Sequence, residues 1–262
     1  METTMSSADK RRTEILDQII HHRVVNVSDL STQYQISEVS IRRDLETLEQ
    51  QGFLKRVHGG AVAIPGANQD RTYNAKIQRN IEEKKRIGLV AAQLIQPGDQ
   101  LMFDSSTTAL QVARSIPGDL LQSGGLTVIS ASIAIVQELG QWKDLNFIVL
   151  GGIYLPEFRS MVGPTTLRYL SDLRADKAFI GTDGFTIESG VTGSNLLEIE
   201  VDRAIAHAAR EVIVVTDSSK LGGTGLATII PVLKINKLIT DTNAPIGLVQ
   251  ELRSLGVDVS LV

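Results

Sequence analysis

Apolar positions at helical spacing mark the start of the chain. Ile15, Leu16, Ile19 and Ile20 form one stripe, which predicts a helix of roughly four turns. Ser28 is predicted to cap a shorter helix that follows. Next, the segment ISEVSIRRDLETLEQQG places three apolar side chains on one helix face, namely Ile41, Leu45 and Leu48. The pattern therefore predicts a small helical unit that ends in a helix-turn-helix.

Two strand-like runs follow this helix pair. The runs FLKRV (53–57) and AVAI (61–64) flank the sequence His-Gly-Gly at 58–60, and paired glycines permit the positive backbone angles of a tight turn. A β-hairpin directly after a helix-turn-helix is the wing of a winged helix-turn-helix. Residues 1–62 are therefore predicted to form one winged-helix domain.

The helix that contains Ile41 also has a distinct outward face. Val39, Ser40, Arg42 and Arg43 point away from its apolar stripe. A helix in a DNA major groove needs donors for phosphates and guanine edges, which the arginines supply, and Val39 can meet a thymine methyl group. The alternative is an ordinary amphipathic helix with a solvated arginine pair.

Basic residues on the predicted wing extend this hypothesis. Arg56 and His58 would lie beside the DNA backbone if the wing flanks the helix. Basic residues on exposed strands are often only solvated, but a position directly after a helix-turn-helix favours DNA contact. The predicted DNA-binding residues are Val39, Ser40, Arg42, Arg43, Arg56 and His58.

The composition changes after the wing. Residues PGANQD, beginning at Pro65, are typical of a short mobile connection, so we predict a linker at 63–74 and a second domain at 75–262. That domain alternates helix-like segments with apolar runs that lack polar alternation, as expected for strands covered on both faces. The runs are QLMFD, LTVIS, NFIVL, KAFIG, EVIVVTD, KLITD and VDVSLV. The predicted fold is α/β, with a mostly parallel sheet flanked by helices.

Charge and cysteine content limit the function classes. The 262-residue chain has a formal net charge of −4, and residues 1–62 contain eight Lys and Arg against nine Asp and Glu, a charge of −1. Attraction to DNA then depends on local clustering of basic side chains and on two subunits that bind together, which predicts a homo-oligomer, a dimer or tetramer. The chain has no cysteine and no apolar run of membrane-spanning length, and charges stand where a signal peptide is apolar. We therefore expect a cytoplasmic protein without a membrane partner.

Polar residues stand directly after one predicted strand. Asp104, Ser105, Ser106, Thr107 and Thr108 follow QLMF and precede an apolar helix. Hydroxyl groups and free backbone donors at the start of a helix suit a phosphate. A simple helix cap with nothing bound explains the same residues.

Three more strand ends carry unusual residues. The pair Gly151-Gly152 follows NFIVL, Gly181 and Asp183 follow KAFI, and Lys220 comes shortly after EVIVVT. Singly, each has an ordinary explanation as a turn, a cap or a solvated surface amine. Ligands of open α/β sheets bind beyond the carboxyl ends of the strands. Together these residues therefore predict one ligand site at one edge of the sheet.

These motifs resemble the DeoR family of bacterial transcriptional regulators along nearly the whole chain. The resemblance is carried by RRDL in the recognition helix, RVHGGA in the wing, DSSTT (104–108), the double glycine, the Asp-Gly pair at 183–184 and DSSK (217–220). It implies a winged helix-turn-helix followed by an effector domain related to phosphosugar isomerases. Members of the family mostly repress sugar-catabolic operons until a phosphorylated sugar binds, and some activate instead.

The resemblance also implies roles for individual residues. The loop 104–108 would hold the phosphate, and Lys220 would pair with phosphate or with a sugar oxygen. Asp183 and Glu198 would hold hydroxyl groups. Glu198 also opens a helix, where a charged carboxylate favours the helix dipole, so a structural role is an equal alternative.

Two departures from the family pattern bear on the sugar. Ser106 replaces the usual glycine of the phosphate loop, and Ser130-Ala131-Ser132 replaces an asparagine flanked by Thr and Ser. A side chain at position 106 narrows the site or adds a donor, and loss of the amide alters the accepted hydroxyl pattern. The identity of the sugar therefore does not transfer from relatives.

An enzyme related to sugar-phosphate isomerases, with an appended winged helix, is the main alternative. It needs a carboxylate or histidine with a tuned pKa near the substrate carbon. The four histidines, at 21, 22, 58 and 207, lie away from the predicted loops, and no nucleophile elbow or metal-ligand spacing occurs. A second alternative is a winged helix that binds protein. We predict a regulator of operator DNA with a phosphorylated sugar effector, and no enzymatic activity, metal or cofactor.

Overall fold

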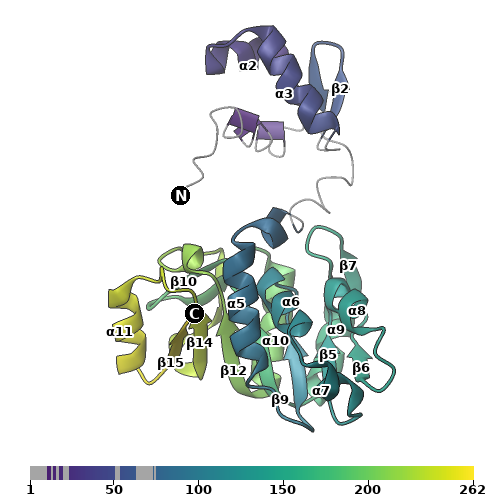
Figure 1. Ribbon diagram of the computed structural model, residues 1–262, viewed down its shortest axis with the longest axis vertical. Coiled ribbons are helices and arrows are strands. Elements are labelled where there is room, and N and C mark those ends of the chain that lie inside the picture. The colour runs from purple at the N-terminus through teal and green to yellow at the C-terminus, as the bar shows by residue number, and fades with distance from the viewer. Residues whose placement is uncertain are drawn as a thin grey trace. The chain divides into compact units, whose positions relative to one another are not determined.

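The computed structural model describes residues 11–12, 14–15, 18–19, 24–50, 54–62, 73 and 75–262. The chain forms two compact units, residues 1–74 and 75–262, and each is described by itself (Figure 1). Leu16, Ile20 and the predicted linker at 63–74, apart from Tyr73, lie outside the described residues.

The first unit is a helix-turn-helix with a small antiparallel sheet. Its elements are β1 (Val24–Asn26), α2 (Val27–Tyr34), α3 (Glu38–Gln50), β2 (Lys55–Val57) and β3 (Gly60–Val62). β2 and β3 form the predicted hairpin, and β1 pairs with the other side of β3. The winged helix-turn-helix is confirmed, with one strand more than the sequence pattern predicts.

Apolar residues predicted from the helical spacing make the core of this unit. Ile41, Leu45 and Leu48 of α3 are buried in one cluster with Ile15 and Ile19. Burial of these side chains drives α2 and α3 together. A single helix of this length is only marginally stable in water.

Two local predictions about the first unit are wrong. Helix α2 begins at Val27, and Asn26 rather than Ser28 occupies its N-cap position. The hairpin turn consists of His58 and Gly59, because Gly60 already belongs to β3. Gly59 has the positive φ, 81°, that the turn requires.

The second unit contains a seven-stranded sheet in which every pair is parallel. Its strands are β4 (Gln100–Phe103), β5 (Thr127–Ser130), β6 (Asn146–Val149), β9 (Ala175–Ile180), β12 (Ala209–Val215), β14 (Lys237–Thr240) and β15 (Asp258–Leu261). Each strand overlaps one of the apolar runs named above, so the predicted α/β fold is confirmed.

The order of the strands reverses once, at the centre of this sheet. The order is β15-β14-β12-β9-β4-β5-β6. From β4 the chain adds β5 and β6 on one side, and from β9 it adds β12, β14 and β15 on the other. Between β4 and β9 the loops at the carboxyl ends therefore lead away in opposite directions. Such a switch point is where open α/β sheets bind ligands.

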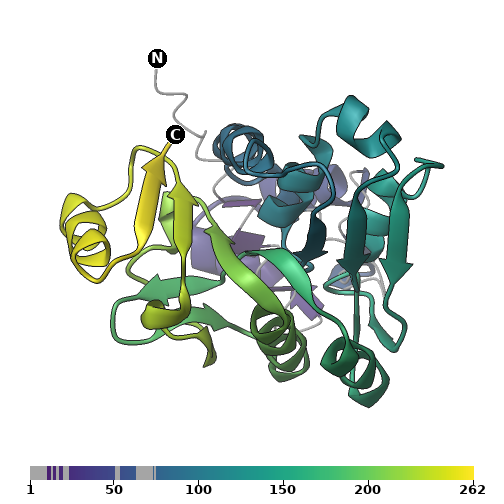
Figure 2. The same cartoon turned by 90° about the horizontal axis from the view of Figure 1, so that it is seen from below.

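Helices cover both faces of the sheet. α5 (Ile81–Ala92) and α6 (Thr107–Arg114) lie on one face, and α9 (Pro164–Asp172) and α10 (Leu196–Ala208) lie on the other (Figure 2). The remaining helical segments are α7 (Gly118–Gln122), α8 (Ile133–Leu139), α11 (Ile246–Ser254), η1 (Ser218–Lys220) and η2 (Val232–Lys234). In the part of the chain that the structure describes, none of the helices combines the length and apolar character needed to cross a bilayer.

Short antiparallel strands surround the main sheet. They are β7 (Ile153–Leu155), β8 (Ser160–Val162), β10 (Gly184–Thr186), β11 (Gly190–Gly193) and β13 (Ala227–Ile230). The sequence pattern does not predict them, because they are short and several consist largely of Gly and Thr. They follow the carboxyl ends of β6, β9 and β12 and so frame that edge of the sheet.

We expect Gly60→Ala to disrupt the first unit. A methyl group at Gly60 would lie 2.1 Å from the Val25 carbonyl oxygen, so the variant should separate β1 from β3 and cost roughly 2 kcal/mol or more. Hydrogen exchange of the full chain should quicken in residues 24–62 and stay unchanged in 175–215. Gly59→Ala is the matched control: it has open space around it and should cost only about 1 kcal/mol for its positive φ. Equal effects of the two substitutions would contradict this account.

Candidate nucleic-acid interface and candidate ligand site

The outward face of α3 carries the side chains predicted to contact DNA. Val39 is 59% exposed although it is apolar, and Arg42 and Arg43 are exposed beside it. Ser40 is half-buried, and its backbone N–H donates to the Ser37 hydroxyl at 3.3 Å. The predicted exposure of the arginine pair and of Val39 is confirmed, while their contact with DNA stays a prediction.

The two arginines of this face are held differently. Arg42 Nη2 lies 2.8 Å from Glu38 Oε2, one helical turn earlier, whereas Arg43 has no ion-pair partner among the residues that the structure describes. An exposed pair at this spacing is worth only about 0.3–0.5 kcal/mol. Arg42 can therefore exchange Glu38 for another anion with little loss of stability.

Arg56 links the wing to the recognition helix. Its backbone N–H and its Nε both donate to the carboxylate of Glu49 on α3, each at 2.8 Å. The hydrogen bond from the Arg56 backbone, followed by that from its side chain, lowers the pKa of Glu49. Arg56 therefore has a structural task that the sequence does not reveal. His58 is exposed at the tip of the turn.

The acidic residue of the RRDL motif has a different role from its arginines. Asp44 is buried, and its Oδ2 lies 2.7 Å from Arg11 Nε. This ion pair ties α3 to the residues that precede the helix-turn-helix. The motif thus presents two arginines to solvent, fixes the helix through Asp44 and buries Leu45 in the core.

At the switch point of the large sheet, a buried carboxylate joins β4 to β9. Asp104 follows β4 and accepts hydrogen bonds from the backbone N–H of Gly181, after β9, at 2.7 Å and from that of Ser106 at 3.0 Å. Burial raises the pKa of Asp104 to about 6, against the opposing effect of the hydrogen bonds from Ser106 and Gly181. The carboxyl group thus fixes the two central loops to each other.

The loop after Asp104 starts helix α6. Ser106 is its N-cap residue and accepts from the Ala109 N–H at 3.1 Å, and its hydroxyl also hydrogen-bonds Asp104. Thr107 and Thr108 are buried, and Ser105 donates to Ser160 Oγ at 2.7 Å. Ser106 therefore supports Asp104 and the helix, and the extended backbone at this residue does not require glycine.

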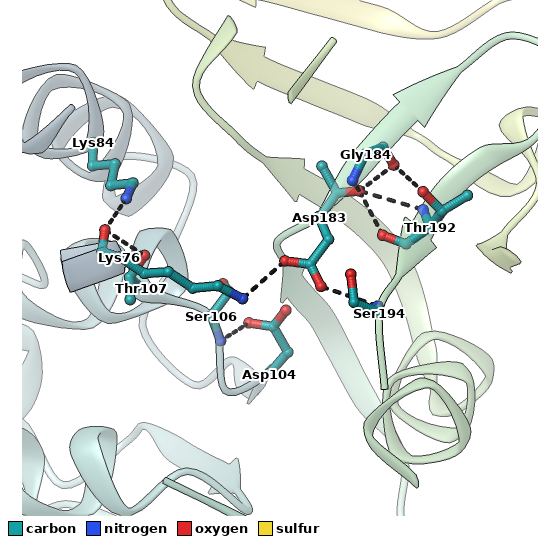
Figure 3. A network of polar contacts seen from close by, with 10 residues as sticks. Lys76, Lys84, Asp104, Ser106, Thr107, Asp183, Gly184, Thr192 and Ser194 are labelled. Atoms are coloured by element: carbon teal, nitrogen blue, oxygen red, sulfur yellow. Dashed lines mark hydrogen bonds and ion pairs between the residues drawn. The ribbon is translucent and has the colours of Figure 1, made fainter. Parts of the chain in front are cut away.

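Charged side chains from distant segments gather beside this loop. We call them the strand-end cluster: Lys76, Lys84, Asp104, Asp183, Glu198, Asp202 and Lys220. Lys76 Nζ lies 3.0 Å from Asp183 Oδ1, and the Ser194 N–H donates to the other oxygen of Asp183 at 3.0 Å (Figure 3). Burial alone would raise the pKa of Asp183, but Lys76 and the hydrogen bond from Ser194 lower it below its ordinary value. Asp183 is therefore the charged acid of the cluster.

Two carboxyl groups on α10 behave in the opposite way. Glu198 and Asp202 lie one helical turn apart. Burial raises the pKa of Glu198 from 4.5 to about 8, and the nearby Asp104 and Asp183 add to this effect while Lys76 opposes it. Burial and the same acidic neighbours also raise the pKa of Asp202 well above its ordinary value. A protonated Glu198 contributes less to the helix dipole than a charged carboxylate would, and both the ligand-binding and the structural role of this residue stay predictions.

Two lysines provide positive charge that is poorly solvated. Lys84 is only 4% exposed, and burial lowers its pKa to about 8, although Asp217 opposes the shift. Burial also lowers the pKa of Lys220, with Asp183 opposing and Lys76 adding to it. A phosphate supplies the negative charge that such a pair lacks.

Some residues of the site were missed by the prediction. Lys76 gives no signal in the sequence, because its partner Asp183 lies 107 residues further along the chain. Lys84 has a detectable signal, since it shares the buried stripe of α5 with Ile87, Gly88 and Ala91, where a lysine is unusual. Asp202 could also have been found, because it shares a face of α10 with Glu198.

Other predicted site residues have structural contacts of their own. The Gly181 N–H is taken by Asp104, and a side chain at Gly181 would collide with Ser106. The Gly151 carbonyl accepts from Thr166 Oγ1 at 2.8 Å, and Gly152 packs against Thr166 and the Val162 carbonyl. Among the described residues, no hydrogen bond or ion pair joins the double glycine to the strand-end cluster, so its place in a ligand site stays a prediction.

The segment Ser130-Ala131-Ser132 is buried after β5. Ser130 Oγ donates to the Phe103 carbonyl at 3.0 Å and accepts from the Ser132 N–H at 3.1 Å. The Ser132 hydroxyl has no hydrogen-bond partner within the described part of the chain. This segment supports the end of β4, which is also where Asp104 begins its loop.

The side chains of the cluster determine which kind of ligand it can hold. Among the described residues, no group of three or more His, Cys, Asp and Glu is placed to hold a metal ion. A groove of about 430 Å³ lies elsewhere, at the start of β12, with Arg203, His207, Arg210 and Lys234 in its lining. The chemistry of the strand-end cluster is therefore that of lysines, carboxyl groups and backbone donors.

Comparison with known proteins identifies relatives along the whole chain. The family model for the DeoR-like helix-turn-helix domain matches residues 11–65, and the model for the DeoR C terminal sensor domain matches residues 79–242. The HTH-type transcriptional regulator GolR of Listeria innocua is 31% identical over 252 residues, which are 96% of this chain and 98% of GolR. The putative aga operon transcriptional repressor of Escherichia coli O157:H7 is 30% identical over 263 residues, which are 100% of this chain and 96% of that protein.

Likeness to solved structures is much weaker. Ribose 5-phosphate isomerase from Methanocaldococcus jannaschii is 18% identical, with a TM-score of 0.39, over 54% of this chain and 55% of its own. A likeness of this size carries no argument about chemistry.

We expect Glu198→Gln to change how stability depends on pH. The folded chain keeps a proton on Glu198 up to about pH 8, whereas the unfolded chain releases it near pH 4.5. Folded protein therefore binds more protons between these values, and its stability falls as pH rises through them, by up to about 1.4 kcal/mol for each pKa unit of difference. The melting temperature of the variant should exceed that of the native protein by more at pH 8 than at pH 5. Glu200→Gln, on the exposed side of α10, is the control, and a difference independent of pH would contradict the assignment.

Proposed function

The chain belongs to the DeoR family of transcriptional regulators, and from this premise we propose that it represses a sugar or polyol operon until a phosphorylated sugar binds its second unit. In this proposal the winged helix-turn-helix binds operator DNA through α3 and the wing. The relatives are named as regulators and repressors, which supports a regulator over an isomerase-like enzyme.

The observation that carries the effector proposal is the mixed charge of the strand-end cluster. Lys84 is a buried cation and Lys220 is a half-buried one. At the start of α6, the N–H groups of Ser106 and Ala109 already donate to Asp104 and to Ser106, so we assign the N–H groups of Thr107 and Thr108 to the ligand. We assign the phosphate to Lys84, Lys220 and the start of α6. A phosphate there would replace lost hydration with charge-assisted hydrogen bonds.

The carboxyl groups of the cluster suit the remainder of a sugar. The pKa of Asp183 is lowered, so this group is ionised and accepts hydrogen bonds, whereas the pKa of Glu198 is raised to about 8, so this group keeps its proton at neutral pH. The pKa of Asp202 is shifted in the same direction as that of Glu198. A protonated carboxyl group both donates and accepts a hydrogen bond. Such a set suits a polyhydroxylated ligand better than an apolar one.

On the DNA side, we propose that Arg42 and Arg43 contact phosphates or guanine edges and that Val39 contacts a thymine methyl group. Ser40 and His58 would bind the DNA backbone, and Arg56 would do so while it stays bound to Glu49. The first 62 residues carry a charge of −1, so we propose that two subunits bind a two-part operator together, in a dimer or tetramer.

Replacement of Arg42 and Arg43 by alanine should weaken binding to DNA from upstream of the regulated operon by at least about tenfold. The salt dependence should also become shallower, because each lost phosphate contact removes about 0.9 from the slope of log affinity against log salt. Electrophoretic mobility shifts over a salt series measure both quantities. Glu38→Gln is a control of opposite sign: it frees Arg42 from its ion pair and should strengthen binding. Unchanged affinity and slope in the double variant would exclude α3 as the DNA-binding element.

A thermal-shift screen of phosphorylated sugars, with their unphosphorylated forms as controls, tests the effector proposal. A ligand at 100 times its Kd should stabilise the chain by about 2.7 kcal/mol, and the same compound should release DNA. Lys220→Ala should remove the stabilisation, whereas Lys234→Ala, which lies outside the cluster, should keep it. The effector proposal fails if no phosphorylated sugar binds or if Lys220→Ala responds like the native protein.

A further inference from the structure

The segment 75–80 is held by side-chain contacts at both of its ends. At one end, Lys76 Nζ lies 3.0 Å from Asp183 Oδ1. At the other, Asn80 Nδ2 donates to Asp217 Oδ1 at 2.7 Å and to Ser219 Oγ at 3.3 Å. This segment begins the second unit, and in the chain it follows directly on the first. It is therefore the part of the second unit that is nearest to the winged helix along the chain.

The backbone of this segment is also held from the cluster. The Lys84 ammonium group donates to the Lys76 carbonyl, and the Thr107 hydroxyl lies 3.5 Å from the same oxygen (Figure 3). The Lys76 ammonium group lies 5.7 Å from the centre of the Phe158 ring. The phosphate is assigned above to Lys84, Lys220 and the start of α6, where Thr107 is the first helical residue. The groups that would bind the effector and the groups that hold the segment are thus the same groups.

Like charges make this arrangement sensitive to an added anion. Lys76, Arg79 and Lys220 surround Lys84, and each of them disfavours its charge. The opposing negative charge comes from Asp183 and Asp217. A phosphate next to Lys84 and Lys220 would carry up to two negative charges, so it would compete with Asp183 for Lys76 and with the Lys76 carbonyl for Lys84.

We propose that Lys76 is the residue that reports effector binding to the winged helix, by leaving Asp183 for the effector phosphate and so loosening the segment Ala75–Asn80. The proposal rests on the proposed function, because it takes the strand-end cluster as the phosphate site. It defines two states with different contacts, Lys76 on Asp183 and Lys76 on phosphate, as coupling between two sites requires. Lys76 is thus both a ligand-binding residue and the link to DNA affinity.

Hydrogen exchange of the full-length protein tests this exchange of partners, with excess inorganic phosphate as the probe and chloride at equal ionic strength as the reference. Amides of residues 104–110 should exchange more slowly with phosphate, while those of residues 75–80 should exchange faster. Slower or unchanged exchange in 75–80, together with protection of 104–110, would overturn the inference and leave the phosphate site intact. Unchanged exchange in both segments would overturn the phosphate site and the inference with it.

Variants at Lys76 separate signalling from binding. Lys76→Met should exchange quickly at 75–80 even without phosphate. Because Lys76 is itself a proposed phosphate ligand, the variant should need more phosphate to protect 104–110, but at saturating phosphate that protection should be complete. Even at saturation, the variant should lose at least fivefold of the phosphate effect on DNA affinity. Lys76→Arg keeps the charge and should restore that effect. Lys85→Met removes an exposed lysine of α5 that pairs with Glu82 at 2.8 Å, and it should behave like the native protein. If Lys76→Met folds, as judged by its melting temperature, and retains the full phosphate effect on DNA affinity, the inference is wrong.

Discussion

The geometry of the strand ends in the second unit depends on one buried hydrogen bond, from the Gly181 N–H to the carboxylate of Asp104. This bond joins β4 to β9 at the point where the strand order of the sheet reverses. A buried carboxylate is costly unless its oxygens are satisfied, and here the loop supplies Ser106 and Gly181 as donors. The same contacts set the start of α6 and the position of Asp183 two residues beyond Gly181. Without this carboxylate, the loops that follow β4 and β9 would no longer be held in their present positions.

The chemistry of this edge works against stability. Lys84 is a nearly buried cation, and Glu198 and Asp202 are carboxyl groups that cannot ionise together near Asp104 and Asp183. An apolar replacement of such groups is often neutral or stabilising. Such groups suit a ligand with both anionic and hydroxyl groups, because that ligand would provide them with charge partners and hydrogen bonds. The cluster thus exchanges some folding stability for binding capacity.

The sequence predicted most of the framework and part of the site. The seven strands of the main sheet were visible because buried parallel strands are short, continuous apolar runs, and α3 was visible because Ile41, Leu45 and Leu48 repeat at helical spacing. Strand β1 was not visible, because three residues carry no periodicity. The strand ends that carry Asp104, Asp183 and Lys220 followed from the topology of parallel sheets. Lys76 did not, because only the folded chain brings it next to Asp183.

Two of the arginines that we propose to bind DNA, one on α3 and one on the wing, have acidic partners. These ion pairs affect how the protein would search a genome for its specific site. Arg42 pairs with Glu38 and Arg56 pairs with Glu49, so in the proposed DNA complex each arginine would leave a carboxylate when it binds a phosphate. Random duplex offers only phosphate in return and gains little from the exchange, whereas a matching site adds contacts to base edges. In the proposed complex, Glu38 and Glu49 would therefore compete with phosphate for the two arginines, shorten the time that the protein spends on non-specific DNA and favour its specific site.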